Sequence, residues 1–78
     1  MENNTKRVKE ITLFKINNHI EYITYAYRKD IMEHYYSQLI GMLDLARSLD
    51  VISIEKYSSI INQVHNIMAN KIIEEGWD

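Results

Sequence analysis

The clearest hydrophobic pattern lies in the last third of the chain, where apolar residues recur at steps of three and four. These residues are Ile54, Tyr57, Ile61, Val64, Met68 and Ile72. This spacing places side chains on one face of a helix. Ser53 can cap the first turn through its hydroxyl, and Gly76 suits the left-handed residue after a helix, with Trp77 then contacting Ile72. The pattern predicts a helix over residues 54–75.

A second stripe predicts a helix over residues 30–49. Its members are Ile31, Tyr35, Leu39, Met42, Ala46 and Leu49. Asp30 is expected to cap this helix, with Glu33 reaching back as the other half of a capping box. The link to residue 53 is short, so the two helices are expected to form an antiparallel hairpin. Gly41 inside this helix is compatible either with a close backbone contact or with a tolerated glycine.

Residues 11–27 admit a strand interpretation because they are rich in Ile, Thr and Tyr, which favour strands. A hairpin that turns at Asn17 and Asn18 would pair Phe14 with Glu21, and the neighbouring pair would also join an apolar to a charged residue. Neither face of such a sheet would be apolar. The helical interpretation fits the pattern better.

A helix over residues 6–28 gathers its apolar residues into a seam with alternating steps of three and four. The seam consists of Leu13, Ile16, Ile20, Ile23 and Tyr27, and this spacing is typical of paired helices. Because the seam continues in phase into Ile31, one long helix from residue 6 to residue 49 is an alternative. The predicted cap at Asp30 favours a break.

The fold class is therefore predicted as all-α, a single domain over residues 1–78 made of three helices. A chain of 78 residues buries only roughly 60% of its surface on folding. Cysteine is absent, which excludes disulfides and thiolate metal sites. Association through helices, as a homodimer, is the favoured source of additional stability. The lack of proline and the presence of only two glycines disfavour an all-β fold.

The charge balance and the hydropathy of the chain bear on its location and its partners. The 9 Lys and Arg residues against 11 Asp and Glu residues do not favour nucleic acid or an anionic membrane as partner. Residues 1–7 lack the apolar centre of a signal peptide, and no stretch approaches the roughly 18 apolar residues of a membrane span. We expect a cytoplasmic protein with no membrane partner.

The chain carries no recognised catalytic or phosphate-binding motif. His19, His34 and His65 are far apart in sequence, and none has the second ligand at helical spacing that a metal site in a bundle requires. Asp30 and Glu33 lie next to His34, a grouping that can transfer protons, but capping explains both acids. We therefore predict no metal, no cofactor and no enzymatic activity.

Basic residues occur in two groups, with tyrosines between them. Lys6, Arg7 and Lys9 precede the first predicted seam, and Arg28 and Lys29 follow it. Basic and aromatic side chains together can bind nucleic acid. However, the ends of a helix of about 20 residues are roughly 30 Å apart, so two small patches are expected. The first group is the candidate nucleic-acid-binding site of the alternative hypothesis below.

The three helices carry more apolar residues than their core stripes use. The surplus comprises Phe14, Tyr22, Tyr25, Tyr36, Ile40, Leu43, Ile60, Ile67 and Ile73. Soluble monomers seldom expose large continuous apolar patches, and tyrosine is enriched at protein interfaces. The surplus predicts self-association, a surface for a partner, or both.

The segment from Met42 to Ala46, followed by residues 49–57, resembles the helical hairpins of small accessory proteins encoded by phages and mobile elements of Gram-positive bacteria. The resemblance covers about a third of the chain and transfers no functional residue. It implies only a manner of action, in which a small protein binds a host or phage protein and blocks or redirects it, as anti-defence inhibitors and recombination accessory factors do.

The leading hypothesis is a small regulatory or inhibitory protein that binds a larger protein through a tyrosine-rich helical surface. Tyr22, Tyr25 and Tyr36 are the candidate anchors, because aromatic residues dominate binding hot spots, and Arg28 and Lys29 are expected to steer the partner. The alternative is a dimeric DNA-associated regulator or recombination accessory factor that binds through the basic segment at residues 6–9.

Overall fold

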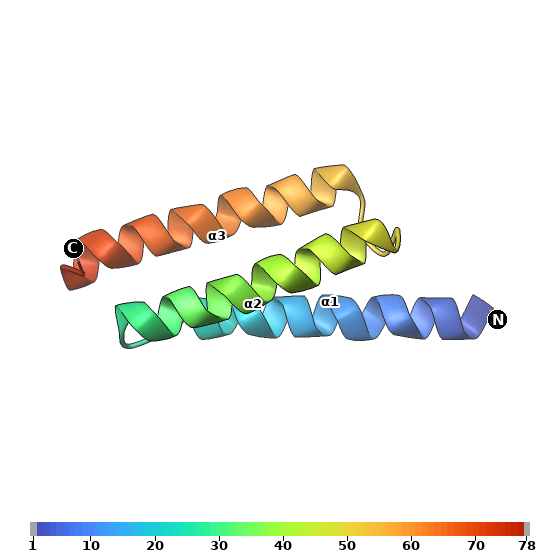
Figure 1. The fold of residues 1–78 in the computed structure, drawn as a ribbon, viewed down its shortest axis with the longest axis horizontal. Helices are drawn as coiled ribbons and strands as arrows, with labels where there is room; N and C mark the ends of the chain where they lie inside the picture. The colour runs from blue at the N-terminus through green and yellow to red at the C-terminus, as the bar shows by residue number, and fades with distance from the viewer. Residues whose placement is uncertain (1, 78) are drawn as a thin grey trace.

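The computed structural model describes the backbone of residues 2–77 and the side chains of residues 5–77. It contains α1 (Glu2–Thr24), α2 (Lys29–Ser48) and α3 (Ile54–Glu75), joined by short links (Figure 1). The described residues form no strand. The all-α prediction is confirmed, and the strand hairpin considered for residues 11–27 is excluded.

The three helices run up, down and up along one elongated body (Figure 1). Its principal extents are 48 × 20 × 14 Å. α2 runs antiparallel to both α1 and α3, as expected for the C-terminal hairpin, and α3 packs against both of the other helices. The N-terminal turns of α1 project beyond the end of α2 (Figure 1). None of the helices in the described residues is long and apolar enough to cross a lipid bilayer.

A turn at residues 25–28 separates α1 from α2, so the single long helix is excluded. The last helical bond of this region joins the Tyr25 amide to the Glu21 carbonyl at 2.9 Å, and Arg28 is extended, with φ −143° and ψ 151°. The Lys71 ammonium of α3 donates to the Thr24 carbonyl at 2.8 Å. A cation at this end of a helix satisfies a free carbonyl and interacts favourably with the helix dipole.

The predicted cap of the second helix is wrong in detail. α2 begins at Lys29, one residue earlier than expected, and its N-cap residue Arg28 makes no side-chain cap bond. The Asp30 carboxylate instead accepts two hydrogen bonds from the Arg28 guanidinium, so the capping box with Glu33 does not form. Asp30 still stabilises the first turn, since a negative charge is favourable at the positive end of the helix dipole.

The link between α2 and α3 closes with two local motifs. The Val51 amide donates to the Ala46 carbonyl at 2.8 Å, and Asp50 has the left-handed φ of 57°, so α2 ends in a Schellman-type motif with aspartate in place of the usual glycine. The hydroxyl of Ser53 then accepts from the Lys56 amide at 3.0 Å. This second contact confirms the predicted N-cap of α3.

The end of α3 also agrees with the sequence pattern. Gly76 is left-handed, with φ 69° and ψ 38°, and the Trp77 amide donates to the Ile72 carbonyl at 3.0 Å. The indole of Trp77 is half-buried against the core, and the Lys71 ammonium lies 5.2 Å from the centre of a Trp77 ring. Trp77 therefore works as the apolar contact of a helix cap.

The core consists of side chains from all three helices and both links. Its buried members are Ile16, Ile23, Ala26, Met32, Leu39, Leu43, Ala46, Ile52, Ile60 and Val64. Only Ile60 and Val64 of α3 are buried. Its other core contacts come from side chains that are half-buried at the margin, namely Tyr57, Ile61, Ile67, Met68 and Ile72. α3 therefore covers the seam between α1 and α2 from one side and leaves the opposite side of that seam open.

Most residues of the predicted stripes are buried or partly buried, but the buried faces differ from the stripes at a few positions. Leu43 and Ile60, expected as surplus, are buried, whereas Leu49, Ile54 and Tyr27, expected in the stripes, are exposed. Residues three and four apart form two adjacent rows on an amphipathic helix, and the packing of the neighbouring helix decides which row is covered. Sequence spacing alone does not contain that information.

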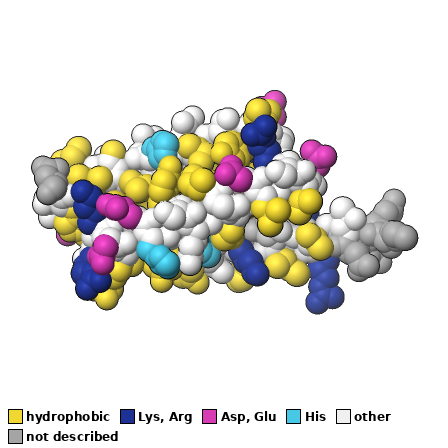
Figure 2. All heavy atoms as spheres, viewed as in Figure 1, with side chains coloured by type: hydrophobic (Ala, Val, Ile, Leu, Met, Phe, Trp, Pro, Cys, Tyr) yellow, Lys and Arg dark blue, Asp and Glu magenta, His cyan; other side chains and the backbone are white. Residues whose placement is uncertain are grey.

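The exposed apolar residues are therefore partly different from the predicted surplus, of which Phe14, Tyr22, Tyr25 and Ile73 stay exposed. Tyr36, Ile40 and Ile67 are partly buried against the core. The large apolar side chains that stay exposed are Val8, Ile11, Phe14, Tyr22, Tyr25, Tyr27, Leu45, Leu49, Ile54 and Ile73. Figure 2 shows hydrophobic side chains at the surface along much of one face, with charged side chains scattered among them.

The N-cap of α3 gives a direct test of this structure. Ser53→Ala removes the acceptor of the Lys56 amide and is expected to lower the free energy of unfolding by about 1 kcal/mol, measured by urea denaturation. Ser59→Ala changes an exposed serine inside the same helix and is expected to be neutral or slightly stabilising. Equal losses in the two variants would contradict the cap.

Candidate functional site

The turn between α1 and α2 directs its side chains alternately inward and outward. Ala26 is buried in the core, while Tyr25 and Tyr27 on either side of it are 80% and 76% exposed. The small side chain of Ala26 lets the turn approach the helices closely. The two neighbouring tyrosines are thereby held at the surface at the end of the α1–α2 pair.

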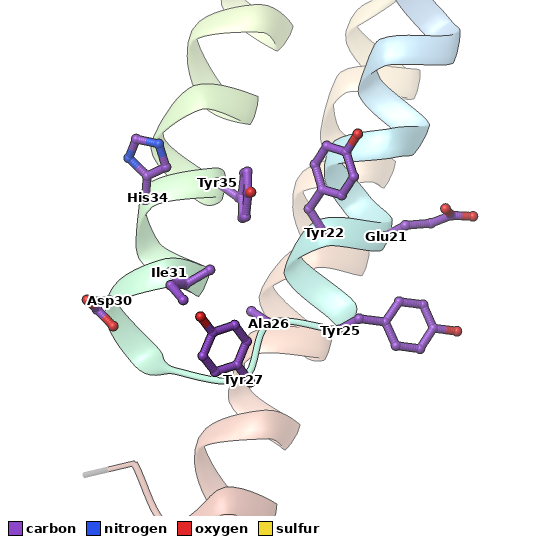
Figure 3. A pocket seen from close by; sticks show the side chains of 9 residues that line it. All are labelled: Glu21, Tyr22, Tyr25, Ala26, Tyr27, Asp30, Ile31, His34 and Tyr35. Carbon is purple, nitrogen blue, oxygen red and sulfur yellow. The ribbon is translucent and has the colours of Figure 1, made fainter.

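These tyrosines border an open cleft of about 830 Å³ between the end of α1, the turn and the start of α2. Figure 3 shows the lining side chains and the helices that carry them. The lining consists of Glu21, Tyr22, Tyr25, Ala26, Tyr27, Asp30, Ile31, His34 and Tyr35. Four of these nine residues are tyrosines, so the surface of the cleft is largely aromatic.

The centre of the cleft is an aromatic pair that joins the two helices. The rings of Tyr22 on α1 and Tyr35 on α2 lie 5.0 Å apart between centres, at an interplanar angle of 44°. His19 lies 5.4 Å from Tyr22 and 6.0 Å from Tyr35, and His34 lies 5.6 Å from Tyr35. Such pairs stabilise a contact beyond the area that they bury. The walls of the cleft are therefore fixed relative to one another.

A hydrogen-bonded chain of side chains supports the same wall. Gln38 on α2 contacts the Nε2 atoms of both histidines, with Oε1 at 3.0 Å from His19 and Nε2 at 3.2 Å from His34. The Nδ1 atom of His19 lies 3.0 Å from the Lys15 carbonyl. The contact of Gln38 with His19 therefore links α1 to α2, whereas its contact with His34 lies within α2. Within the described residues, no three side chains of the metal-binding types come together.

The charged residues that line the cleft are acidic, whereas the basic residues Arg28 and Lys29 were expected from the sequence to steer a partner toward it. Glu21 and Asp30 flank it on the α1 side and the α2 side (Figure 3), and no lysine or arginine lines it. The Arg28 guanidinium is bound by Asp30, with Nε–Oδ1 at 2.9 Å and Nη2–Oδ2 at 2.8 Å, and its central carbon lies 5.9 Å from the centre of the Tyr27 ring.

This ion pair changes the pKa values of both of its members. The hydrogen bond from Arg28, with the attraction of its charge, holds the pKa of the Asp30 carboxyl below its ordinary value. The same hydrogen bond and charge raise the pKa of Arg28. Both side chains are well exposed, so the pair contributes little to stability. Its main effect is to neutralise Arg28 locally.

A second groove continues from the cleft along the α1–α2 pair, away from the turn. It has a volume of about 650 Å³ and shares Tyr22 with the cleft. The other lining residues are Lys15, Asn18, His19, Gln38, Gly41, Met42 and Leu45. A Cβ atom on Gly41 would meet nothing within 4 Å, so Gly41 is a tolerated glycine and not a close backbone contact.

The structure brings together only part of the predicted partner surface. Tyr22 and Tyr25 line the cleft, and Arg28 lies beside it, whereas Lys29 is exposed but does not line it. Tyr36 is turned toward α3, where its hydroxyl contacts His65 Nε2 at 2.8 Å. Tyr36 therefore belongs to the packing between α2 and α3.

Sequence reasoning missed Tyr27 and Tyr35 as parts of the site. Their spacing fits the core stripes, so the sequence pattern predicts both as core residues. Tyr35 is half-buried and Tyr27 lies in the turn, after the end of α1. Glu21 was missed as well, because nothing in its sequence context distinguishes it from a solvated surface residue.

The remaining sequence candidates do not join this site. Lys6, Arg7 and Lys9 are exposed near the projecting end of α1, well away from Arg28 and Lys29, so the two basic patches stay separate as expected.

A further hydrogen bond joins α2 and α3 away from the cleft, where the Tyr57 hydroxyl donates to Asp44 at 2.8 Å. This bond raises the pKa of Tyr57.

Comparisons with family models, curated proteins and solved structures found no match to this chain.

The Arg28–Asp30 pair predicts a pH dependence with a defined sign. Because the folded-state pKa of Asp30 is lowered, the stabilisation by the pair is complete at neutral pH and is lost as the pH falls through that lowered pKa. Arg28→Gln should move the pKa of Asp30 back toward its ordinary value, as followed by NMR of the side-chain carboxyl. Lys29→Gln removes a neighbouring charge but keeps the hydrogen bonds, so it should leave the pKa low.

Proposed function

We propose that this protein is a small regulatory or inhibitory protein that binds a larger protein through the tyrosine cleft at the α1–α2 turn. The observation that supports this proposal best is the convergence of Tyr22, Tyr25, Tyr27 and Tyr35 on one open cleft of about 830 Å³. Tyrosine is among the residues that carry most of the energy of protein interfaces.

The contacts between the walls of the cleft also support a binding role. The Tyr22–Tyr35 pair and the hydrogen bond between Gln38 and His19 join the two walls, and Lys71 holds the end of α1 where the turn begins. A surface that is already ordered loses little conformational entropy when a partner binds. A role such as that of a phage or mobile-element anti-defence or accessory protein is consistent with this arrangement and forms part of the proposal.

Self-association through the second groove is the other part of the proposal. Leu45 lines this groove and is 61% exposed, and Leu49, the C-cap residue of α2, is also exposed. Ile11 and Phe14 of α1 are exposed as well. A second copy of the chain that covers these side chains would remove apolar surface from water and leave the turn end of the cleft free.

Photo-crosslinking tests the partner surface. Replacing Tyr25 with p-benzoylphenylalanine in cells that naturally express the protein is expected to give a covalent adduct with a larger protein, seen as a heavier band and identified by mass spectrometry. The same replacement at Ile73, which is equally exposed but lies on α3, is the matched control and should give no such band. Adducts of the same mass from both positions, or from Tyr25 only with a second copy of the chain, contradict the proposal.

Sedimentation equilibrium tests the dimer. The wild-type chain is expected to show twice its own mass at micromolar concentration. Leu45→Gln should weaken dimerisation at least about tenfold, because it places a polar amide on both sides of a symmetric apolar contact. Ile73→Gln changes a similarly exposed residue outside the groove and should have no effect. A strictly monomeric wild-type protein would exclude this part of the proposal.

A further inference from the structure

The cleft combines aromatic ring faces with carboxylates, and this combination indicates what kind of side chain it accepts. Its lining holds four tyrosines, Glu21 and Asp30, and no lysine or arginine. Ring faces attract cations through their quadrupole. Carboxylates bind the guanidinium group through paired, charge-assisted hydrogen bonds. Both features favour a positively charged occupant.

The protein already contains an example of this recognition at the edge of the cleft. The Arg28 guanidinium lies near the face of Tyr27, 5.9 Å from its centre, and donates two hydrogen bonds to Asp30. The same ring and the same carboxylate line the cleft. Tyr27 and Asp30 are therefore arranged in a way that suits an arginine side chain, and in the free protein Arg28 contacts both of them from beside the cleft.

We propose that the cleft accepts an arginine side chain from a basic segment of the partner protein. This inference rests on the proposed function and reverses the expected role of Arg28. As an exposed cation, Arg28 would steer an acidic partner toward the site. As the internal ligand of Tyr27 and Asp30, it instead competes with the arginine of the partner.

Charge complementarity disfavours the opposite occupant. The two charged residues that line the cleft, Glu21 and Asp30, are both acidic, and the nearby Arg28 is already paired with Asp30. Bringing like charges together without compensation is unfavourable. An acidic segment of a protein is therefore a poor ligand for this cleft.

Substitution of Arg28 tests whether its side chain competes with the arginine of the partner. Arg28→Gln removes the guanidinium while it leaves Tyr27 and Asp30 in place. Arg28 makes no side-chain cap bond to α2, so the helix start does not depend on its side chain. Arg47 is the matched control, because its guanidinium lies 5.6 Å from the centre of the Tyr57 ring, in the same kind of contact but outside the cleft.

The experiment is an NMR titration with two blocked amino acids, N-acetyl-arginine amide and its neutral isostere N-acetyl-citrulline amide. The arginine probe is expected to shift the ring signals of Tyr22, Tyr27 and Tyr35 in a saturable manner, and the citrulline probe should bind at least about fivefold more weakly, since it lacks the charge. N-acetyl-glutamate amide should leave these signals unchanged.

Three variants then test whether Arg28 and Asp30 act on the binding of arginine itself or only on the stability of the protein. Arg28→Gln should bind the arginine probe several-fold more tightly than the wild type, Arg47→Gln should bind it as the wild type does, and Asp30→Asn should bind it more weakly. Thermal melting followed by circular dichroism verifies that each variant is folded. Equal binding of arginine and citrulline, or weaker binding by Arg28→Gln, would overturn the inference.

The two proposals fail in distinguishable ways. A larger protein crosslinked at Tyr25 together with a cleft that does not prefer arginine over citrulline would retain the proposed function and reject the basic partner segment. An arginine-selective cleft without any crosslinked protein would retain the chemistry of the cleft and reject the role in binding a larger protein.

Discussion

The structure depends on the break of the helix after Thr24. The apolar seam of α1 continues in phase into α2, and neither glycine nor proline lies between them to stop the helix. The break is stabilised by contacts from elsewhere in the chain: Lys71 of α3 binds the last carbonyl of α1, and Ala26 enters the core. Once the seam is folded back on itself, its two halves bury one another. α3 then closes this pair from one side only.

The cleft is a direct consequence of that break. A turn that buries Ala26 must place its neighbours Tyr25 and Tyr27 outside, and the antiparallel return of α2 sets Tyr35 against Tyr22. Because α3 covers one side of the pair, the other side carries the cleft and the groove that extends it. The elements that stabilise the fold are thus the same ones that position the site.

Helix bounds that depend on residues close in sequence could be predicted. Features that depend on the packing of helices distant in sequence could not. The bounds of α3 follow from Ser53 and Gly76, which act within their own turns. The end of α2 was predicted within one residue, but the motif that closes it was not, because Asp50 takes the left-handed conformation usually held by glycine. Tyr22 and Tyr25 could be identified as surplus aromatics. Tyr27 and Tyr35 could not, since their spacing equals that of core residues and only the position of the turn separates the two cases.

The presence of tyrosine at four positions explains how an aromatic cleft can be exposed to water without forming a continuous apolar patch. A tyrosine ring offers apolar faces and a π-surface to a ligand, while its hydroxyl can be hydrated. Leucine or phenylalanine at the same four positions would present a continuous apolar patch and favour nonspecific association. The contacts of Arg28 with Tyr27 and Asp30 work in the same direction, because they satisfy a ring face and a carboxylate within the protein itself. The cleft of the free protein therefore combines aromatic ring faces with polar groups.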